Sequence, residues 1–287
     1  MNHSANTRDA RSDYREYAPP RSLADHFLCF WTQSITGCQG EYAQRVLPDG
    51  CIDMIFINEE APIVVGPWVN HFVARFPAGT TVVGARWRTG RAPALLGHPS
   101  SELLNQSVAL RDVWSVTLSS SFEQVSEQPN LLVRKSSLED MLLSLLPDAP
   151  PSDPIVNVSI QWLARHPHGR VGQLSRWIGI SGRQLQRRFS ASVGYGPKSF
   201  QSILRFQRLL HLARRVGRRG GLAELSADVG YGDQAHMTRE VQRFSGCPPT
   251  VLFQSAQCTL RMSDVFTTPV DDLDKLHEEF GAPVKTA

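Results

Sequence analysis

The pattern of apolar and polar positions changes along the chain. Up to about Trp87, short runs rich in Val and Ile alternate with Gly- and Pro-containing turns, as in RVLPDGCIDMIFI, APIVVGPW and TTVVGARW. Such runs are typical of β-strands. After Gly90 the apolar positions recur at helical spacing, and from Ile155 onward the pattern predicts helices alone. We therefore expect an α+β domain followed by an all-α domain.

The segment LPDAPPSDP, Leu146 to Pro154, separates the two domains. Its four prolines cannot continue a helix. Just before it, Ser136-Ser137-Leu138-Glu139 has the pattern of a capping box, in which a serine oxygen and an acidic group satisfy free backbone N–H groups. This pattern predicts that the last helix of the first domain starts near Ser136.

The second domain contains an internal repeat. Leu174-Ser175 and Ile178-Gly179 recur 51 positions later as Leu225-Ser226 and Val229-Gly230, and with one inserted residue the match continues to Pro197. Each copy reads as a short helix, a turn at a glycine and a second helix. A glycine between two short amphipathic helices is the signature of a helix-turn-helix, because the sharp turn needs a residue without a Cβ clash.

The second helix of each copy has a predictable register. Ser181 is the expected cap of the first, with Gln184 completing a capping box, and Gly232 or Asp233 is the expected cap of the second. The apolar side chains then expected on the inner faces are Leu185, Phe189, Met237 and Val241. The side chains expected on the outer faces are Arg183, Gln186 and Arg187 in the first copy and Gln234, Thr238 and Arg239 in the second.

These outer side chains favour DNA binding. Arg and Gln carry forked groups that pair with guanine and adenine edges, and the first turns of a recognition helix are where bases are met. Between the copies, Pro197 to Val216 predicts one helix of 20 residues, about 30 Å long. That length is close to the roughly 34 Å between successive major grooves on one DNA face. A bundle with merely solvated polar residues, or a protein-binding helix-turn-helix, is the alternative.

Charge is divided unequally between the parts of the chain. Residues 155–258 hold 15 Lys and Arg against 4 Asp and Glu, whereas the rest holds 15 against 23. This asymmetry indicates an anionic partner for the second domain. The residues expected to contact DNA phosphates are Arg176, Lys198, Arg205 and Arg215.

Residues 155–255 resemble the DNA-binding domain of AraC/XylS-family transcription regulators. The resemblance lies in LSRWIGISGRQLQRRFSASVGYGPKSF and LAELSADVGYGDQAHMTREVQRFSGCPPTVLF, with the long helix between them. It implies a seven-helix fold with both recognition helices in the major groove of one DNA face, and base or backbone contacts by the six outer side chains. Aromatic residues usual in the second unit are replaced by Met237 and Val241, and a polar residue by Ala235. This departure implies weaker or more phosphate-directed binding there.

The first domain resembles a domain of unknown role that precedes this module in some family members. The resemblance lies in VLPDGCIDMIF and the later VVGARWRTGRAPALLGHPSSELLNQ, and it implies a sensor or dimerisation domain. Asp53, Arg86 and Trp87 are the candidates to line a small-molecule pocket. The alternative is that Asp53 is buried and simply pairs with an arginine or a backbone N–H group.

Signatures of other function classes are missing. The sequence has no GxxxxGK[ST], HExxH or GxSxG motif, so we expect neither an enzyme nor a cofactor. His166 and His168 follow a predicted helix and are expected to interact with its C-terminal end rather than to bind a metal. The five cysteines have no CxxC spacing, which favours reduced thiols in a cytoplasmic protein.

The expected organisation follows from these patterns. The chain is predicted to comprise a flexible tail at 1–20, a sensor or dimerisation domain at 21–148, a linker at 149–154, the DNA-binding domain at 155–258 and an acidic tail at 259–287. We expect a regulator that binds promoter DNA, contacts RNA polymerase, responds to a small-molecule effector and forms a homodimer, with no membrane attachment. The alternative is a ligand-independent regulator whose first domain only dimerises or contacts polymerase.

Overall fold

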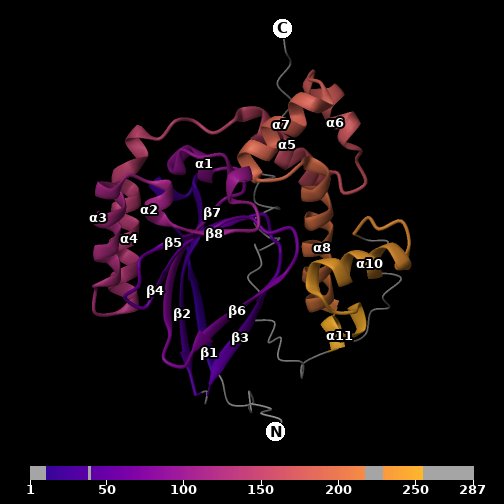
Figure 1. Cartoon of the computed structure of the whole chain (residues 1–287). Helices are drawn as coiled ribbons and strands as arrows, with labels where there is room; N and C mark the ends of the chain where they lie inside the picture. Colours follow the sequence, from indigo (N-terminus) through magenta and orange to yellow (C-terminus); the bar gives the residue numbers. More distant parts are fainter. Residues whose placement is uncertain (1–10, 38–39, 217–228, 255–287) are drawn as a thin grey trace.

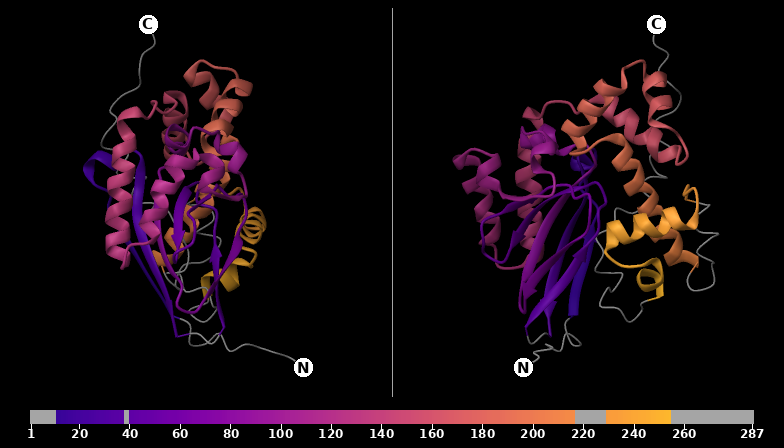
Figure 2. Two further views of the ribbon diagram at one scale, coloured as in Figure 1. Left: turned by 60° about the vertical axis from the view of Figure 1, so that its left-hand side comes forward. Right: turned by 45° about the vertical axis from the view of Figure 1, so that its right-hand side comes forward.

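The computed structural model describes residues 11–37, 40–216 and 229–254. A sheet-rich first domain lies beside a helical second domain, as Figures 1 and 2 show. This arrangement confirms the expected fold class, an α+β domain followed by an all-α helix-turn-helix region. Among the described helices, none is long and apolar enough to cross a membrane.

Two antiparallel sheets form the body of the first domain. The larger has the strand order β1-β2-β7-β4-β5-β8 and the smaller pairs β3 with β6. The strands of the larger sheet are β1 (Arg11–Tyr17), β2 (Phe27–Thr36), β7 (Thr81–Trp87), β4 (Ile52–Ile57), β5 (Ile63–Val65) and β8 (Ser107–Ala109). The smaller sheet consists of β3 (Glu41–Val46) and β6 (Phe72–Pro77).

Strand β1 corrects one expectation. The sequence predicts a flexible tail over residues 1–20, but Arg11–Tyr17 pair with β2 over their whole length. Charged residues at alternate positions of RSDYREY conceal the strand, and such charges are common on edge strands, where they discourage pairing with another chain. Tyr14 points inward and packs on Trp31, with 5.7 Å between ring centroids.

The larger sheet has an apolar core on each face. On one face, helices cover Phe27, Trp87 and their neighbours (Figure 1). These helices are α1 (Ala92–Leu96), α2 (Leu110–Val113), α3 (Val116–Ser126) and α4 (Leu131–Leu145), with short 3-10 turns η2 (Arg21–Leu23), η3 (Ser100–Leu103) and η4 (Leu146–Asp148). The other face carries a smaller cluster around Trp31, Ile55 and Val82, against which Val46 and Phe76 of the smaller sheet pack.

Helix α4 starts earlier than the sequence predicts. Its N-cap is Asn130, whose side chain accepts a hydrogen bond from Val133 N at 2.9 Å. The expected start at Ser136 is therefore wrong, and Ser136 lies inside the helix. Glu139 instead forms an ion pair with Lys135 at 2.7 Å, as residues four apart on a helix do.

The second domain is helical throughout its described part. Its helices are α5 (Pro154–Arg165), α6 (Val171–Ile178), α7 (Gly182–Val193), α8 (Pro197–Val216), α10 (Gln234–Ser245) and α11 (Pro249–Gln254). Helix α5 begins where the proline-rich boundary ends, and Asp153 caps it by accepting from the backbone N–H groups of Ile155 and Val156. The first helix expected in the second repeat copy falls on residues 217–228, outside the described residues.

Candidate nucleic-acid interface

Helix α7 begins with the predicted capping box. Ser181 Oγ accepts a hydrogen bond from Gln184 N at 3.2 Å, and Gln184 Oε1 accepts one from Ser181 N at 3.0 Å. The box fixes the register of the helix. Leu185 and Phe189 are consequently fully buried in the core of the second domain, as predicted.

The three candidate base-contacting residues of α7 are all exposed. Arg183, Gln186 and Arg187 lie on the side opposite the buried face. Gln186 Nε2 donates to Ser190 Oγ at 3.3 Å, so this side chain lies back along the helix. It also covers Gly196, where an added Cβ would collide with the Gln186 amide. Arg183 and Arg187 are exposed on the same helix.

Helix α10 has the same arrangement as α7: a capped start, a buried apolar face and an exposed polar face. Asp233 is its N-cap and accepts from His236 N at 2.6 Å. Met237 and Val241 are fully buried, while Gln234, Thr238 and Arg239 are exposed. The Thr238 hydroxyl donates to the Gln234 carbonyl at 2.8 Å, so its hydrogen is engaged within the helix and its oxygen can only accept from a partner.

The glycines of the repeat have matching backbone roles. Gly194 and Gly246 end α7 and α10 in the left-handed region, with φ of 98° and 71°. Gly179 and Gly230 occupy the turns before the two helices, with φ of 80° and 91°. A residue with a Cβ is strained in this region, which explains why the repeat keeps glycine at all four positions.

Helix α8 connects the two units and packs on both. It has the predicted bounds and 20 residues. Near its start, the ring of Phe200 packs on that of Phe189 of α7, with 5.4 Å between centroids. Near its middle, the ring of Phe206 packs on that of Phe244 of α10, with 5.2 Å between centroids. One rigid element therefore carries both candidate recognition helices.

The candidate phosphate contacts divide into two groups. Arg176 and Lys198 are exposed. Arg205, in contrast, is only 14% exposed; its Nη2 lies 3.6 Å from Glu240 Oε2 and its guanidinium lies over the Tyr231 ring. This arginine holds α8 to α10. The side chain of Arg215 lies outside the described part of the chain.

The ends of α7 and α10 face the first domain, so their starts face away from it. Gly194 lies against Pro67, and Gly246 lies against His71. Each helix has 12 residues, which corresponds to about 18 Å. In the right-hand view of Figure 2 the second domain lies to one side of the sheets, and α10 runs outward from them.

The candidate ligand-binding residues of the first domain are placed on two faces of the sheet. Asp53 and Arg86 are paired across β4 and β7, with 3.1 Å between Arg86 Nε and Asp53 Oδ1. Trp31 Nε1 donates to the same carboxylate at 3.0 Å. Trp87 points to the opposite face and packs on Phe27, with ring centroids 5.2 Å apart. The structure thus brings Asp53 together with Arg86 and Trp31, and separates Trp87 from them.

A second carboxylate shares this arginine. Asp49 Oδ2 lies 3.6 Å from Arg86 Nη1. Burial raises the pKa of Asp49 to about 6, an effect that the attraction of Arg86 only partly offsets. Burial lowers the pKa of Arg86, but the Asp53 and Asp49 carboxylates outweigh it, so this pKa lies well above its usual value. The cluster is a charged network inside the first domain.

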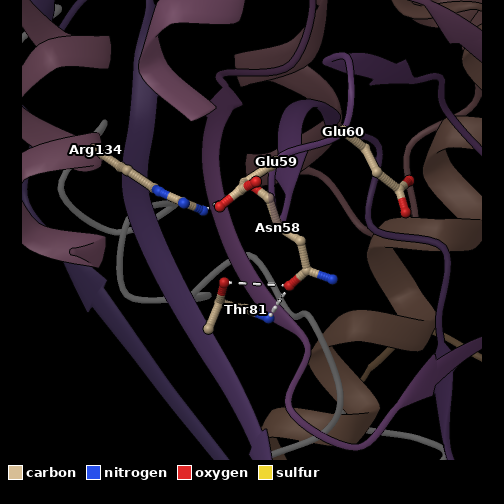
Figure 3. Close-up of a pocket in the computed structure, with 5 residues that line it drawn as sticks. All are labelled: Asn58, Glu59, Glu60, Thr81 and Arg134. Carbon is tan, nitrogen blue, oxygen red and sulfur yellow. Dashed lines mark hydrogen bonds between the residues drawn. The ribbon is translucent and has the colours of Figure 1, made fainter. Parts of the chain in front are cut away.

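A surface hollow next to this domain's helices was not predicted from the sequence. Figure 3 shows it lined by Asn58, Glu59, Glu60, Thr81 and Arg134. Arg134 donates to the carbonyls of Asn58 at 2.6 Å and Gln128 at 2.9 Å. The arginine ties α4 to the end of β4, which gives this site a structural role.

His166 lies at the end of α5, as expected. His166 follows α5, and its Nδ1 lies 2.8 Å from the Trp162 carbonyl. Its ring stacks on Trp162 with 4.4 Å between centroids. Within the described ranges no group of three or more His, Cys, Asp and Glu side chains is arranged to hold a metal ion.

Comparison with known proteins bears on both domains. A family model described as a helix-turn-helix domain matches residues 174–255, and one described as a domain of unknown function (DUF6597) matches residues 15–109. A Streptomyces lividans protein described as an AraC-like transcription regulator is 32% identical over 102 residues, which cover 34% of this chain and 32% of that protein. The C-terminal region is an AraC-type helix-turn-helix domain. The chain spans about a third of the length of this curated relative.

Solved structures of ToxT from Vibrio cholerae also resemble the chain at a low level. One, from strain O395, is 9% identical with a TM-score of 0.42 and covers 87% of this chain and 99% of its own. Another is 8% identical with a TM-score of 0.43 and covers 86% and 98%. The likeness is too low to carry a conclusion about function. The AraC-type assignment therefore rests on the sequence of the second domain.

Proposed function

We propose that this protein is a transcription regulator that binds double-stranded DNA sequence-specifically in the cytoplasm. The observation that carries the proposal is the pair of repeat-related helices α7 and α10. Both start on the side away from the first domain and expose forked polar side chains there. One 20-residue helix joins their units, and its length suits two successive major grooves.

The exposed residues have different roles in this proposal. Arg183, Gln186 and Arg187 read bases in the first half-site, because Arg and Gln pair with purine edges. Gln234, Thr238 and Arg239 do so in the second, with a smaller share because the Thr238 hydroxyl hydrogen is engaged within the helix and leaves the oxygen only as an acceptor. Arg176 and Lys198 contact phosphates and position the protein without reading sequence.

Selection of binding sites from a random duplex library tests the proposal. The full-length protein is used at about 0.15 M salt, because affinity for DNA depends steeply on salt. We expect two short conserved blocks with centres about 10 base pairs apart. One block alone would assign sequence reading to α7 only, and no enrichment at any protein concentration would contradict the proposal.

For the first domain, the Asp53 network favours a role without a small ligand. Both oxygen atoms of Asp53 accept hydrogen bonds from Arg86, and Trp31 adds a third donor. A domain that associates with a second copy or contacts RNA polymerase fits this better than an effector pocket at Asp53. A screen of a metabolite library distinguishes the ligand-independent role from the effector-gated one. The operator affinity and the oligomeric state of the full chain are measured with each compound, and a compound that changes either quantity would support effector gating.

A further inference from the structure

One short segment of the first domain reaches both helix-turn-helix units. It is Pro67–His71, which together with Gly66 forms the connection between β5 and β6. Its base is fixed to its own domain, because Asn105 N donates to the Pro67 carbonyl at 3.0 Å and Val69 N donates to Asn105 Oδ1 at 3.0 Å. Gly66, just before it, lies so close to the Leu103 backbone that an added Cβ would collide with the Leu103 carbonyl. The segment is therefore a fixed part of the first domain.

The start of this segment contacts the end of α7. Pro67 lies against Gly194, where an added Cβ would collide with Pro67 Cγ. Beside it, Ser100 Oγ donates to the Ser192 carbonyl at 2.8 Å, and this hydrogen bond is buried. The carbonyl of Ser192, in the last turn of α7, is thus bound by the first domain.

The end of the same segment contacts the end of α10. Asn70 Oδ1 accepts a hydrogen bond from Arg243 Nε at 3.4 Å, and the ring of His71 lies against Gly246. Arg45, on neighbouring β3, donates to the Ser245 carbonyl. The two repeat-related C-caps, Gly194 and Gly246, therefore meet opposite ends of a single five-residue segment.

This geometry constrains the two helices relative to each other. Even fully extended, the four Cα steps from Pro67 to His71 span at most about 14 Å. The first domain also contacts the helix between the units, since Gln207 Nε2 of α8 donates to the Pro48 carbonyl at 2.7 Å. Bending of α8, or rotation of the second unit about it, would break contacts at one end of Pro67–His71 or the other.

We propose that Pro67–His71 acts as a brace that fixes α10 relative to α7 and so sets which half-site spacing the protein accepts. This inference rests on the proposed DNA-binding function. Each base pair added between half-sites turns the second one by roughly 35° around the DNA axis, because a full turn takes about 10 base pairs. A braced pair of helices cannot follow that rotation, whereas a pair joined by α8 alone follows it more easily.

A spacing series tests the brace in the full-length protein. Operators with spacers one base pair shorter, unchanged and one base pair longer are titrated with wild type and with the double variant Asn70→Ala, His71→Ala. We expect wild type to lose at least tenfold in affinity on either change and the variant to lose clearly less. Arg75→Ala is the matched control, because Arg75 lies on β6 with its side chain 63% exposed and forms a long surface ion pair with Glu41, at 3.9 Å.

Two results of this series would overturn the brace. One is a variant whose spacing profile matches that of wild type. The other is a double variant that binds all three operators more tightly than wild type by the same factor. That result would mean that the segment shields the DNA-binding face. If the double variant does not fold, Arg45→Ala with Asn70→Ala removes two polar contacts to α10 and leaves His71 in place.

A measurement without DNA separates the brace from the proposed function. Spin labels are placed at Arg187 and Arg239, which are exposed and equivalent in the repeat. Cys38 and Cys258 are replaced by serine in the labelled protein. Cys29, Cys51 and Cys247 are retained, because their burial protects them from the labelling reagent. We expect the label–label distance distribution to broaden in the Asn70→Ala, His71→Ala variant. If the distribution broadens in the variant but the wild-type protein does not bind DNA, the brace is supported and the proposed DNA-binding function is rejected. If the distribution does not change, the brace is rejected.

Discussion

Gly194 ends α7 directly against the ring of Pro67, which belongs to the other domain. A methyl group at Gly194 would collide with Pro67 Cγ and stand 3.1 Å from the Ser100 carbonyl oxygen. The proline ring is closed onto the backbone nitrogen and the carbonyl belongs to the backbone, so neither can turn aside as a flexible side chain does. Glycine is therefore required here both for its φ of 98° and for the approach of the two domains.

Gly194→Ala is accordingly expected to destabilise the protein more than an alanine at an open C-cap. Gly97 is the matched control: it ends α1 with φ of 71° and has open space where a Cβ would stand. The left-handed strain costs about 1 kcal/mol at either site, and the collision at Gly194 adds about 1–3 kcal/mol. Urea unfolding of both variants measures the difference, and equal losses would show that Pro67 does not press on α7 in solution.

Arg183→Ala is expected to relax the first half-site. Loss of a bidentate contact to a guanine costs about 1–3 kcal/mol of discrimination against the other bases. The measurement is binding to a set of operators with each base substituted in turn within that half-site. Arg188→Ala is a suitable control, because Arg188 pairs with Asp153 at 2.7 Å and lies outside the expected base-reading stripe. An affinity loss that is equal for every base would make Arg183 a phosphate contact.

Arg205→Ala distinguishes a structural from a DNA-binding role. The sequence suggests a phosphate contact, but the side chain is largely buried between α8 and α10 beside Glu240. Removing it leaves the Glu240 carboxylate without this cation, so we expect lower stability and an unchanged salt dependence of DNA binding. A phosphate contact would instead reduce the slope of log affinity against log salt by about 1. Lys198→Ala, at an exposed position, is expected to show that reduced slope with little change in stability.

Local chemistry explains why the second domain is largely readable from sequence. The capping box at Ser181, the glycine turns and the apolar stripe of α7 all act within a few residues, and each is found where the pattern places it. The same holds for α8, whose start at Pro197 follows from the fixed φ of proline. Arg205 is the exception. Its partner Glu240 lies in another helix, and charge patterning along the chain does not reveal that contact.

The first domain is less readable because its contacts are distant in sequence. Strand β1 is charged and becomes a strand only through pairing with β2. The opposite orientations of Arg86 and Trp87 follow from strand alternation, which separates neighbours in sequence onto two faces. The Pro67–His71 segment gives no sequence signal of contact with α7 and α10. These contacts span more than 100 residues and depend on how the domains dock.

Asp49 gives the protein a pH dependence whose sign follows from its environment. Its carboxylate is 11% exposed, and burial raises its pKa from the ordinary 3.8 to about 6. Between these values the folded protein binds a proton that the unfolded chain does not. The folded state is therefore favoured progressively as pH falls from 6 toward 4, by up to about 3 kcal/mol. Burial lowers the pKa of His26 and of His71, and both oppose this trend below pH 6.5.

Comparison with Asp49→Asn isolates the aspartate. Asparagine has no proton to bind but retains an oxygen that can accept from Cys51 N, as Asp49 Oδ1 does at 2.9 Å. Both histidines remain in the variant, so their contributions cancel in the difference. The unfolding free energy of wild type minus that of Asp49→Asn, measured in urea from pH 4.5 to 7.5, is expected to rise as pH falls through 6. A difference that is flat over this range would mean that Asp49 stays ionised because Arg86 outweighs its burial.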